Sequence, residues 1–393
     1  MRSLLIFLIS VSYLVRSDEL KIYVDADFSN YYESSRSIEL GVLSAIKYHD
    51  AKLDGHTIKV ERLDHHGNNR RSLRNLKTVL DHNDTLAVFC GMHSPPVLAN
   101  RDFTNENKIL LMDPWAAAAP ITRPSSEANY IFRLSVDDKT AGSFLMKAAV
   151  EKYRVKRPYL LLENTGWGKN NLFTLSQAMQ ELNISSAGVG WFNWGLSDLV
   201  MKNLMNEIND VSADSIILVG NSNESARMLN AMALAGIDLP VISHWGLTGG
   251  DFYNKLSQAA RDIKLKFIQT SCALNDHMKE PMLKQAMRDY PNDFSGNYLK
   301  SPAGFIHAYD LTSILINATR PHFHRRGIGL RQSVKNELEN MPVKTVGLLK
   351  TYDKPFRKYT IADLFSHEAL TVKDYCLAEF NASGQIILSS HNE

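Results

Sequence analysis

Residues 86–97, LAVFCGMHSPPV, contain the features that decide the fold. The run Leu86–Cys90 is continuously apolar and rich in strand-forming residues, so it is predicted to be a buried strand. Ser94 is a good helix N-cap and Pro95 suits the first helical position, which places a helix directly after the strand. A strand that leads straight into a helix is typical of parallel α/β sheets.

The same alternation runs through the first third of the chain. Apolar runs predict strands at Leu20–Val24 and Ile109–Met112, and the alternation of apolar and polar residues predicts another at Thr57–Leu63. Apolar residues at three- and four-residue spacing predict helices at Ser35–Tyr48 and around Leu73 to Leu80. Four strand–helix units therefore predict one parallel sheet covered by helices.

A second series of elements begins near residue 159. Its predicted strands are Tyr159–Leu162, Val189–Phe192, Ile216–Val219, Val241–Ser243 and Lys266–Ser271, and its predicted helices are 169–182, 197–209 and 223–235. Helices at 302–318 and 329–340 and two tail strands, Tyr375–Phe380 and Ile386–Ser389, follow. No linker rich in Pro, Gly or Ser separates the two series. The predicted fold class is therefore α/β, with two lobes that each contain a parallel sheet and between which the chain crosses several times.

Composition agrees with an ordinary globular chain. It has 393 residues, 44% of them hydrophobic, with 44 Lys+Arg against 42 Asp+Glu. This length is enough for two or three domains with their own cores, and it excludes collagen-like, disordered and disulfide-framed small proteins. Because the charges nearly balance, no basic stripe is available to bind a nucleic-acid backbone.

Residues 1–17, MRSLLIFLISVSYLVRS, predict a secretory signal peptide. Arg2 precedes an apolar run, Leu4–Val15, that is shorter than the roughly 20 residues of a membrane span. The alternatives are an uncleaved anchor and a buried N-terminal strand. Removal would leave 376 residues (393 − 17) as a soluble protein outside the cytoplasm.

All five tryptophans lie at or just after the carboxyl end of a predicted strand. In open α/β sheets, ligands bind at this edge. Trp115, Trp167 and Trp245 lie in loops rich in Gly and Ala and are predicted to face a cleft. Trp191 and Trp194 are expected only to pack at sheet edges.

Two polar residues near the same edge are candidates for ligand contact. The helix that begins near Ser94 would direct its N-terminus into the cleft, which suits a carboxylate, and the hydroxyl would add a donor. The alternative interpretation of Ser94 is a plain structural cap. His244, between a strand end and Trp245, is a candidate pocket donor.

An enzyme is the alternative function. The sequence contains no G-x-S-x-G, H-E-x-x-H, C-x-x-C or phosphate-loop pattern. A hydrolase or transferase on a similar scaffold would use His244 or His307 with Ser94. His65-His66 beside Asp64 resembles a metal site, but the Gly-Asn-Asn-Arg-Arg continuation favours a polar turn and a helix start. No cofactor and no metal are expected.

The three cysteines do not form a framework. Cys90 and Cys272 lie on predicted apolar strands, where a thiol behaves as a small hydrophobe, and Cys376 lies in the tail. An oxidising compartment allows one disulfide, but the sequence does not select the pair.

Short motifs in a fixed order extend over essentially the whole chain after residue 17. They are Ile38-Glu-Leu-Gly41 to Tyr48, Leu63-Asp64 with Asn68 and Arg70, Gly91 to Ser94, Asp113-Pro-Trp-Ala-Ala117, Phe132-Arg133, Thr165-Gly-Trp-Gly168, Gly246 to Gly250, and Ala308-Tyr309-Asp310. In these motifs the chain resembles the type I periplasmic solute-binding proteins, in particular the leucine/isoleucine/valine-binding branch. Each motif alone is weak, whereas their order and spacing are specific for the fold.

The resemblance implies two Rossmann-like lobes that close on a small ligand about a hinge. The first lobe would comprise residues 18–135 and 271–345, and the second 136–270 and 346–393. Three crossings are expected, at Phe132–Val136, Phe267–Ser271 and Val343–Gly347. The implied role is capture of an amino-acid-like compound, amine or carboxylate for an ABC transporter permease or a membrane sensor protein, in the periplasm and without catalysis.

The resemblance also places the site. Ser94, Ala116 and Ala117 would line the first-lobe half, and Trp167 replaces a family tyrosine in the second lobe. Trp245 stands where amino-acid-binding relatives have a carboxylate for the ligand's ammonium group. The expected ligand therefore presents an alkylated amine or a flat ring to Trp167 and Trp245, with its polar end toward Ser94.

Overall fold

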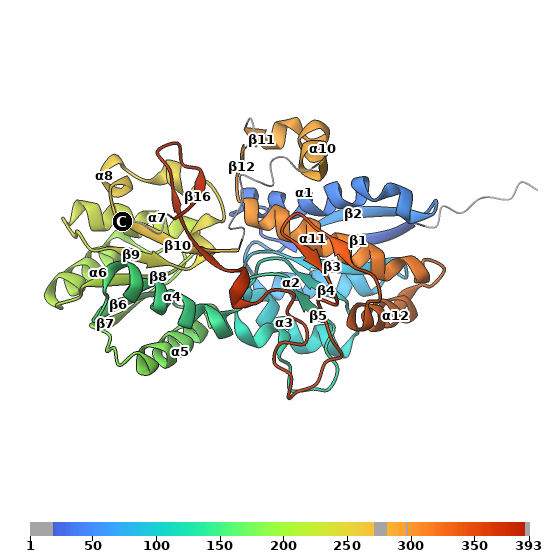
Figure 1. The fold of residues 1–393 in the computed structure, drawn as a ribbon, viewed down its shortest axis with the longest axis horizontal. Coiled ribbons are helices and arrows are strands. Elements are labelled where there is room, and N and C mark those ends of the chain that lie inside the picture. The colour runs from blue at the N-terminus through green and yellow to red at the C-terminus, as the bar shows by residue number, and fades with distance from the viewer. Residues whose placement is uncertain (1–18, 271–280, 296–297, 390–393) are drawn as a thin grey trace, which may run out of the picture.

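The computed structural model describes residues 19–270, 281–295 and 298–389. They form two lobes that lie side by side (Figure 1). The predicted α/β class, with a parallel sheet in each lobe, is confirmed.

The first lobe contains a five-stranded parallel sheet of order β2-β1-β3-β4-β5. Its strands are β1 Glu19–Ala26, β2 Thr57–Asp64, β3 Thr85–Cys90, β4 Leu111–Asp113 and β5 Ile131–Arg133. Its helices are α1 Tyr32–Tyr48, α2 Asn69–Leu80, α3 Ser94–Glu106, α10 Pro281–Asp289, α11 Pro302–Thr319 and α12 Gly327–Asn340.

Side chains of β1 alternate between the two faces of this sheet. Ile22 and Val24 belong to the apolar cluster that includes Ile38 of α1, whereas Tyr23 belongs to the cluster that includes Leu76 of α2. Since successive strand residues point to opposite faces, both faces are covered by helices. Figure 1 shows α1 beside α11, which returns from late in the chain.

The second lobe contains a seven-stranded sheet of order β16-β15-β10-β9-β8-β6-β7, in which β15 and β16 run antiparallel to their neighbours. Its strands are β6 Pro158–Glu163, β7 Gly188–Phe192, β8 Ser215–Val219, β9 Val241–Ser243, β10 Leu265–Gln269, β15 Cys376–Phe380 and β16 Ile386–Leu388. Its helices are α4 Asp138–Tyr153, α5 Gly166–Glu181, α6 Asp198–Asp210, α7 Ser222–Leu234 and α8 Gln258–Arg261. Two short antiparallel pairs complete the fold, β11 Phe294–Ser295 with β12 Tyr298–Leu299 and β13 Thr345–Val346 with β14 Thr351–Tyr352.

The chain passes between the lobes at the expected first place. β5 ends at Arg133 and α4 begins at Asp138, so the first crossing overlaps the predicted Phe132–Val136. The predicted second crossing begins in β10, and its last residue, Ser271, lies outside the described residues.

The third crossing comes later than the predicted Val343–Gly347. The rings of Phe356 and His367 pack on Phe132 of β5, with centroids 4.9 and 4.0 Å apart, and Tyr359 donates a hydrogen bond of 2.7 Å to the Pro124 carbonyl. Residues 346–370 therefore lie on the first lobe, and the chain crosses just before β15. The sequence of this segment shows no regular spacing of apolar residues, neither the two-residue repeat of a strand nor the three- to four-residue repeat of a helix. Its position on the first lobe could therefore not be predicted from hydrophobic periodicity.

One local prediction differs from the structure in detail. Helix α3 begins at Ser94 and His93 occupies the cap position, so Ser94 is the first helical residue and not the N-cap. Cys90 is a buried free thiol, whereas Cys376 is disulfide-bonded. In the ranges described, no helix combines the length and apolar character needed to cross a bilayer.

Candidate functional site

The carboxyl ends of strands from both sheets meet where the lobes touch. Trp115 follows β4 of the first lobe, and Trp245 follows β9 of the second and opens a short 3-10 helix, Trp245–Thr248. Their ring centroids are 5.4 Å apart, and each side chain is about 1% exposed. The two predicted cleft tryptophans therefore pack against each other across the lobe boundary.

Trp167 extends the same aromatic surface from the second lobe. It lies in the first turn of α5, whose N-cap Thr165 accepts a hydrogen bond from the Gly168 N–H. Its ring meets His244 edge-on at 5.1 Å. A Cβ atom at Gly246 would lie 2.6 Å from the Trp167 ring, so the close approach of this loop requires glycine.

Two of these indoles carry unsatisfied donors. Nε1 of Trp115 and Nε1 of Trp167 are buried and have no hydrogen-bond partner within the described chain. A buried donor without a partner costs about 1–3 kcal/mol, and most buried polar groups avoid this cost. Two such donors, one from each lobe, are suited to acceptor atoms of a molecule bound between the lobes.

The first-lobe loops hold the other predicted residues. Ser94 Oγ accepts a hydrogen bond of 3.2 Å from the Ala118 N–H, so its own O–H remains able to donate. Ala116 N donates to Asp113 Oδ1 at 2.7 Å, and the Ala117 carbonyl accepts from the Asp138 N–H at 2.9 Å. Both alanines are buried, and their backbone is fixed by these contacts.

His244 is engaged within its own lobe. Nδ1 accepts a hydrogen bond from the Trp245 N–H at 2.9 Å, which requires that this nitrogen carry no proton. The proton therefore lies on Nε2, which is 2.8 Å from Asp138 Oδ1. Burial raises the pKa of Asp138, and the contact with His244 opposes that shift. Because both ring nitrogens are occupied, His244 positions the Trp245 loop.

An acidic half of the interface was missed by the sequence prediction. Tyr31 of the first lobe donates a buried hydrogen bond of 2.7 Å to Glu224 Oε2, in the first turn of α7. Glu163, the last residue of β6, accepts from Asn221 Nδ2 at 2.9 Å. Burial raises the pKa of Glu163 to about 7. Glu224 and Glu163 therefore add carboxyl groups to the lobe boundary, beside Tyr31 and Asn221.

Asp27 and His93 continue this acidic half in the first lobe. His93 Nε2 lies 3.5 Å from Asp27 Oδ2, and both side chains are buried. Burial alone would raise the pKa of Asp27, but the His93 ring and the Asn30 N–H donors outweigh it and lower the pKa to about 2. Asp27 follows β1 and Glu163 ends β6, so the strand-end rule that singled out the tryptophans was a usable signal for both.

Trp194 does more than pack at a sheet edge, so that interpretation was wrong. Its ring lies 4.8 Å from the His93 ring of the opposite lobe, and a Cβ atom at Gly67 would lie 2.9 Å from it. Trp191, in β7, is only partly buried and joins the hydrophobic cluster.

Asn221 lies between the acidic residues and the aromatic residues of the interface, which are Trp115, Trp167 and Trp245. A Cβ atom at Gly246 would lie 3.2 Å from Asn221 Oδ1 as well as against the Trp167 ring. Asn221 in turn binds Glu163. The interface therefore places carboxyl groups near tilted and edge-on aromatic rings and unsatisfied N–H donors, an arrangement suited to a small molecule with both polar and flat parts.

The histidines proposed for an enzyme are occupied elsewhere. His307 contacts Thr270 Oγ1 at 2.7 Å and the Pro114 carbonyl at 3.0 Å, whereas the Ser94 hydroxyl oxygen accepts from Ala118.

The interpretation of the His65-His66 segment as a polar turn is confirmed, because Asn68 caps α2 by accepting from the Arg70 and Arg71 N–H groups.

Comparisons with known proteins agree with this geometry. A family model described as periplasmic binding protein matches residues 24–362. The chain therefore belongs to the periplasmic binding protein family. No curated protein matches the chain.

Solved structures share the fold at low sequence identity. A type 1 periplasmic binding protein from Bordetella pertussis Tohama I is 18% identical, with a TM-score of 0.78 over 94% of this chain and 99% of that one. The branched-chain amino acid transporter substrate binding protein LivJ from Streptococcus pneumoniae, in complex with isoleucine, is 16% identical, with a TM-score of 0.74 over 94% and 97%. An ABC transporter solute binding protein from R. palustris, in complex with benzoate, is 13% identical, with a TM-score of 0.75 over 94% and 95%. Together with the family, these structures support a ligand-binding role.

Proposed function

We propose that this protein captures a small organic ligand between its lobes and passes it to a membrane partner without chemical change. The observation that carries the proposal is the pair of buried, unsatisfied indole N–H groups of Trp115 and Trp167, which come from opposite lobes. A carboxylate or carbonyl oxygen would satisfy them and reach the Ser94 hydroxyl.

The proposed ligand class follows from the aromatic and the acidic residues of the interface. The rings of Trp167 and Trp245 favour a flat or apolar body, and Glu163 and Glu224 accommodate an amine. Isoleucine and benzoate, bound by the LivJ and R. palustris proteins, represent these two types. The partner would be an ABC transporter permease or a membrane sensor, and residues 1–17 would direct the chain out of the cytoplasm as a signal peptide.

A thermal-shift screen of the chain from residue 18 onward tests the proposal. The panel contains isoleucine, leucine, benzoate and 4-hydroxybenzoate. A compound at 100 times its Kd stabilises the folded state by about 2.7 kcal/mol. Binding should also change tryptophan emission, and a compound that stabilises the protein without changing this emission would contradict an interlobe site.

Replacing Trp167 by Phe should weaken binding, while the free protein loses only the packing of the larger ring. The substitution removes an N–H that has no partner in the free protein, so folding loses no hydrogen bond. If the N–H donates to the ligand, one hydrogen bond is lost, and affinity for the best panel compound should fall by about 2- to 10-fold. Calorimetric titration measures this change, and an unchanged Kd would remove the Trp167 N–H from the site.

Ligand should close the two lobes as rigid bodies about the crossings. A hinge motion of this kind makes the protein more compact without changing its secondary structure. Small-angle scattering should therefore give a smaller radius of gyration with saturating ligand than without it. Identical curves in both states would count against a hinge.

A further inference from the structure

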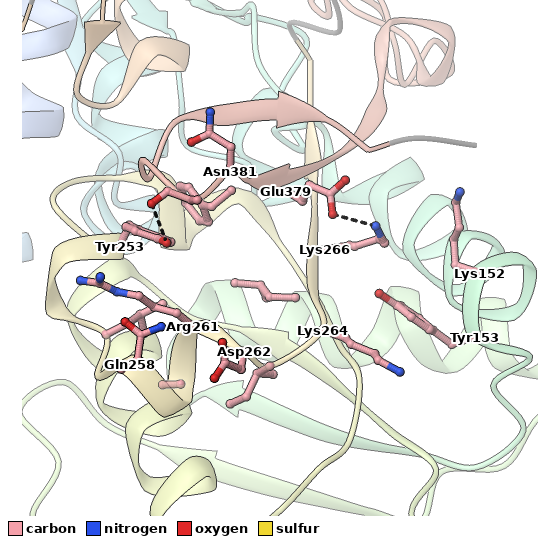
Figure 2. Close-up of a pocket in the computed structure, with 16 residues that line it drawn as sticks. Lys152, Tyr153, Tyr253, Gln258, Arg261, Asp262, Lys264, Lys266, Glu379 and Asn381 are labelled. Atoms are coloured by element: carbon pink, nitrogen blue, oxygen red, sulfur yellow. Dashed lines mark hydrogen bonds and ion pairs between the residues drawn. The ribbon is translucent and has the colours of Figure 1, made fainter. Parts of the chain in front are cut away.

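The second lobe carries a separate pocket of about 570 Å³ at the end opposite the lobe boundary. It lies where the C-terminus of α4, the start of β10 and the hairpin of β15 and β16 meet (Figure 2). Its volume falls in the range of roughly 300–1,000 Å³ that small-molecule sites occupy. None of the five tryptophans lines it.

The charge of this pocket is positive. Its lining includes four cations, Lys152, Arg261, Lys264 and Lys266, against the two acids Asp262 and Glu379, which gives a formal balance of +2 (4 − 2). One acid is already neutralised, because Lys266 Nζ lies 2.9 Å from Glu379 Oε2. Asp262 is the other acid of the lining, so the pocket keeps a positive formal balance.

Arg261 is the best-defined anchor in the pocket. Its guanidinium carbon lies 4.6 Å from the centroid of the Tyr253 ring, and the Tyr253 hydroxyl is held by the Ala382 carbonyl at 3.2 Å. Nε of Arg261 is buried and has no hydrogen-bond partner among the residues described. An arginine whose orientation is fixed by a ring while its Nε lacks an acceptor is suited to bidentate binding of a carboxylate.

The lining also contains apolar side chains. Leu256, Ile263, Leu265 and Phe380 line the pocket together with the polar residues. Figure 2 shows Arg261 and Gln258 on one side and Lys264 with Tyr153 on the other. A ligand that fits this arrangement has a flat apolar body and an acid group at each end.

We propose that this pocket is a second binding site, which takes a small aromatic or apolar dicarboxylate, with Arg261 holding one carboxylate and Lys264 attracting the other. The site does not depend on the interlobe site. It lies at the opposite ends of the second-lobe strands and uses none of the same residues.

Isothermal titration with benzene-1,4-dicarboxylate tests the proposal, and the uncharged diamide of the same ring is the matched probe. The dicarboxylate should bind and the diamide should not. Arg261→Gln should weaken binding by about 10-fold or more, because a charge-assisted hydrogen bond is lost. Lys264→Gln should weaken it less and reduce the dependence on salt. Lys202→Gln, which removes an exposed lysine of α6 outside the pocket, should leave the affinity unchanged.

The same titration on Trp245→Ala separates the two sites. Binding that persists in this variant and is lost in Arg261→Gln supports the second site. Binding that is lost in Trp245→Ala and kept in Arg261→Gln would assign the dicarboxylate to the interlobe site and overturn the proposal. Equal binding of the diamide, or binding of an acidic peptide but not of the dicarboxylate, would also overturn it.

Discussion

Replacing Trp245 by Ala should weaken ligand binding by roughly 30-fold or more, equivalent to at least about 2 kcal/mol. The ring is nearly completely buried, meets Trp115 of the opposite lobe and lies 5.3 Å from His307. Its removal would take away a large apolar surface at the lobe boundary. Calorimetric titration with the best compound of the thermal-shift panel gives the change in Kd.

Two further variants keep this prediction open to refutation. Trp191→Ala removes the same side chain from β7, where it is only partly buried, and should change Kd far less. Trp245→Phe keeps a ring in the core and should show an intermediate loss if Trp245→Ala is too unstable to measure. Equal losses in Trp191→Ala and Trp245→Ala would mean that Trp245 acts only through stability.

Replacing Arg133 by Met should lower the free energy of unfolding by about 3–5 kcal/mol. The guanidinium is fully buried at the end of β5 and binds Glu368 at 2.8 and 2.7 Å and Asp137 at 2.8 Å. Without it, the two carboxylates share only Arg123. The network also joins the 366–370 segment to the first crossing. Urea denaturation measures the expected decrease in the free energy of unfolding.

A surface ion pair provides the control. Arg357 and Asp363 form a pair of 2.9 Å whose side chains are 56% and 36% exposed. Arg357→Met should cost less than about 1 kcal/mol, because exposed pairs are weak and screened by salt. Similar losses in Arg133→Met and Arg357→Met would contradict the structural role of the buried network.

Much of the fold could be predicted because its strands are continuous apolar runs. Val241–Ser243 was predicted to the residue, and other strand predictions differed by one or two residues at their ends. Helix α4 was not predicted. Its buried face includes Ala141, Gly142, Ala148 and Ala149, which give little apolar contrast with its exposed face.

The candidate site was predictable only in part. Trp115, Trp167 and Trp245 follow strand ends, and that local rule predicted that they face a cleft. The Tyr31–Glu224 contact joins residues 193 positions apart in different lobes. Such a contact depends on how the lobes close against each other, which no local pattern encodes. The contact of Trp194 with His93 of the opposite lobe also depends on how the lobes are arranged, and the sequence around Trp194 contains no signal for it.

A crystal structure of the protein grown with the best compound of the panel tests the interlobe site most directly. The account predicts ligand density between the lobes, with an acceptor atom within hydrogen-bond distance of Trp115 Nε1 or Trp167 Nε1 and a flat or apolar part against Trp245. Density for that compound only outside the lobe boundary, with both indole N–H groups still unsatisfied, would contradict it.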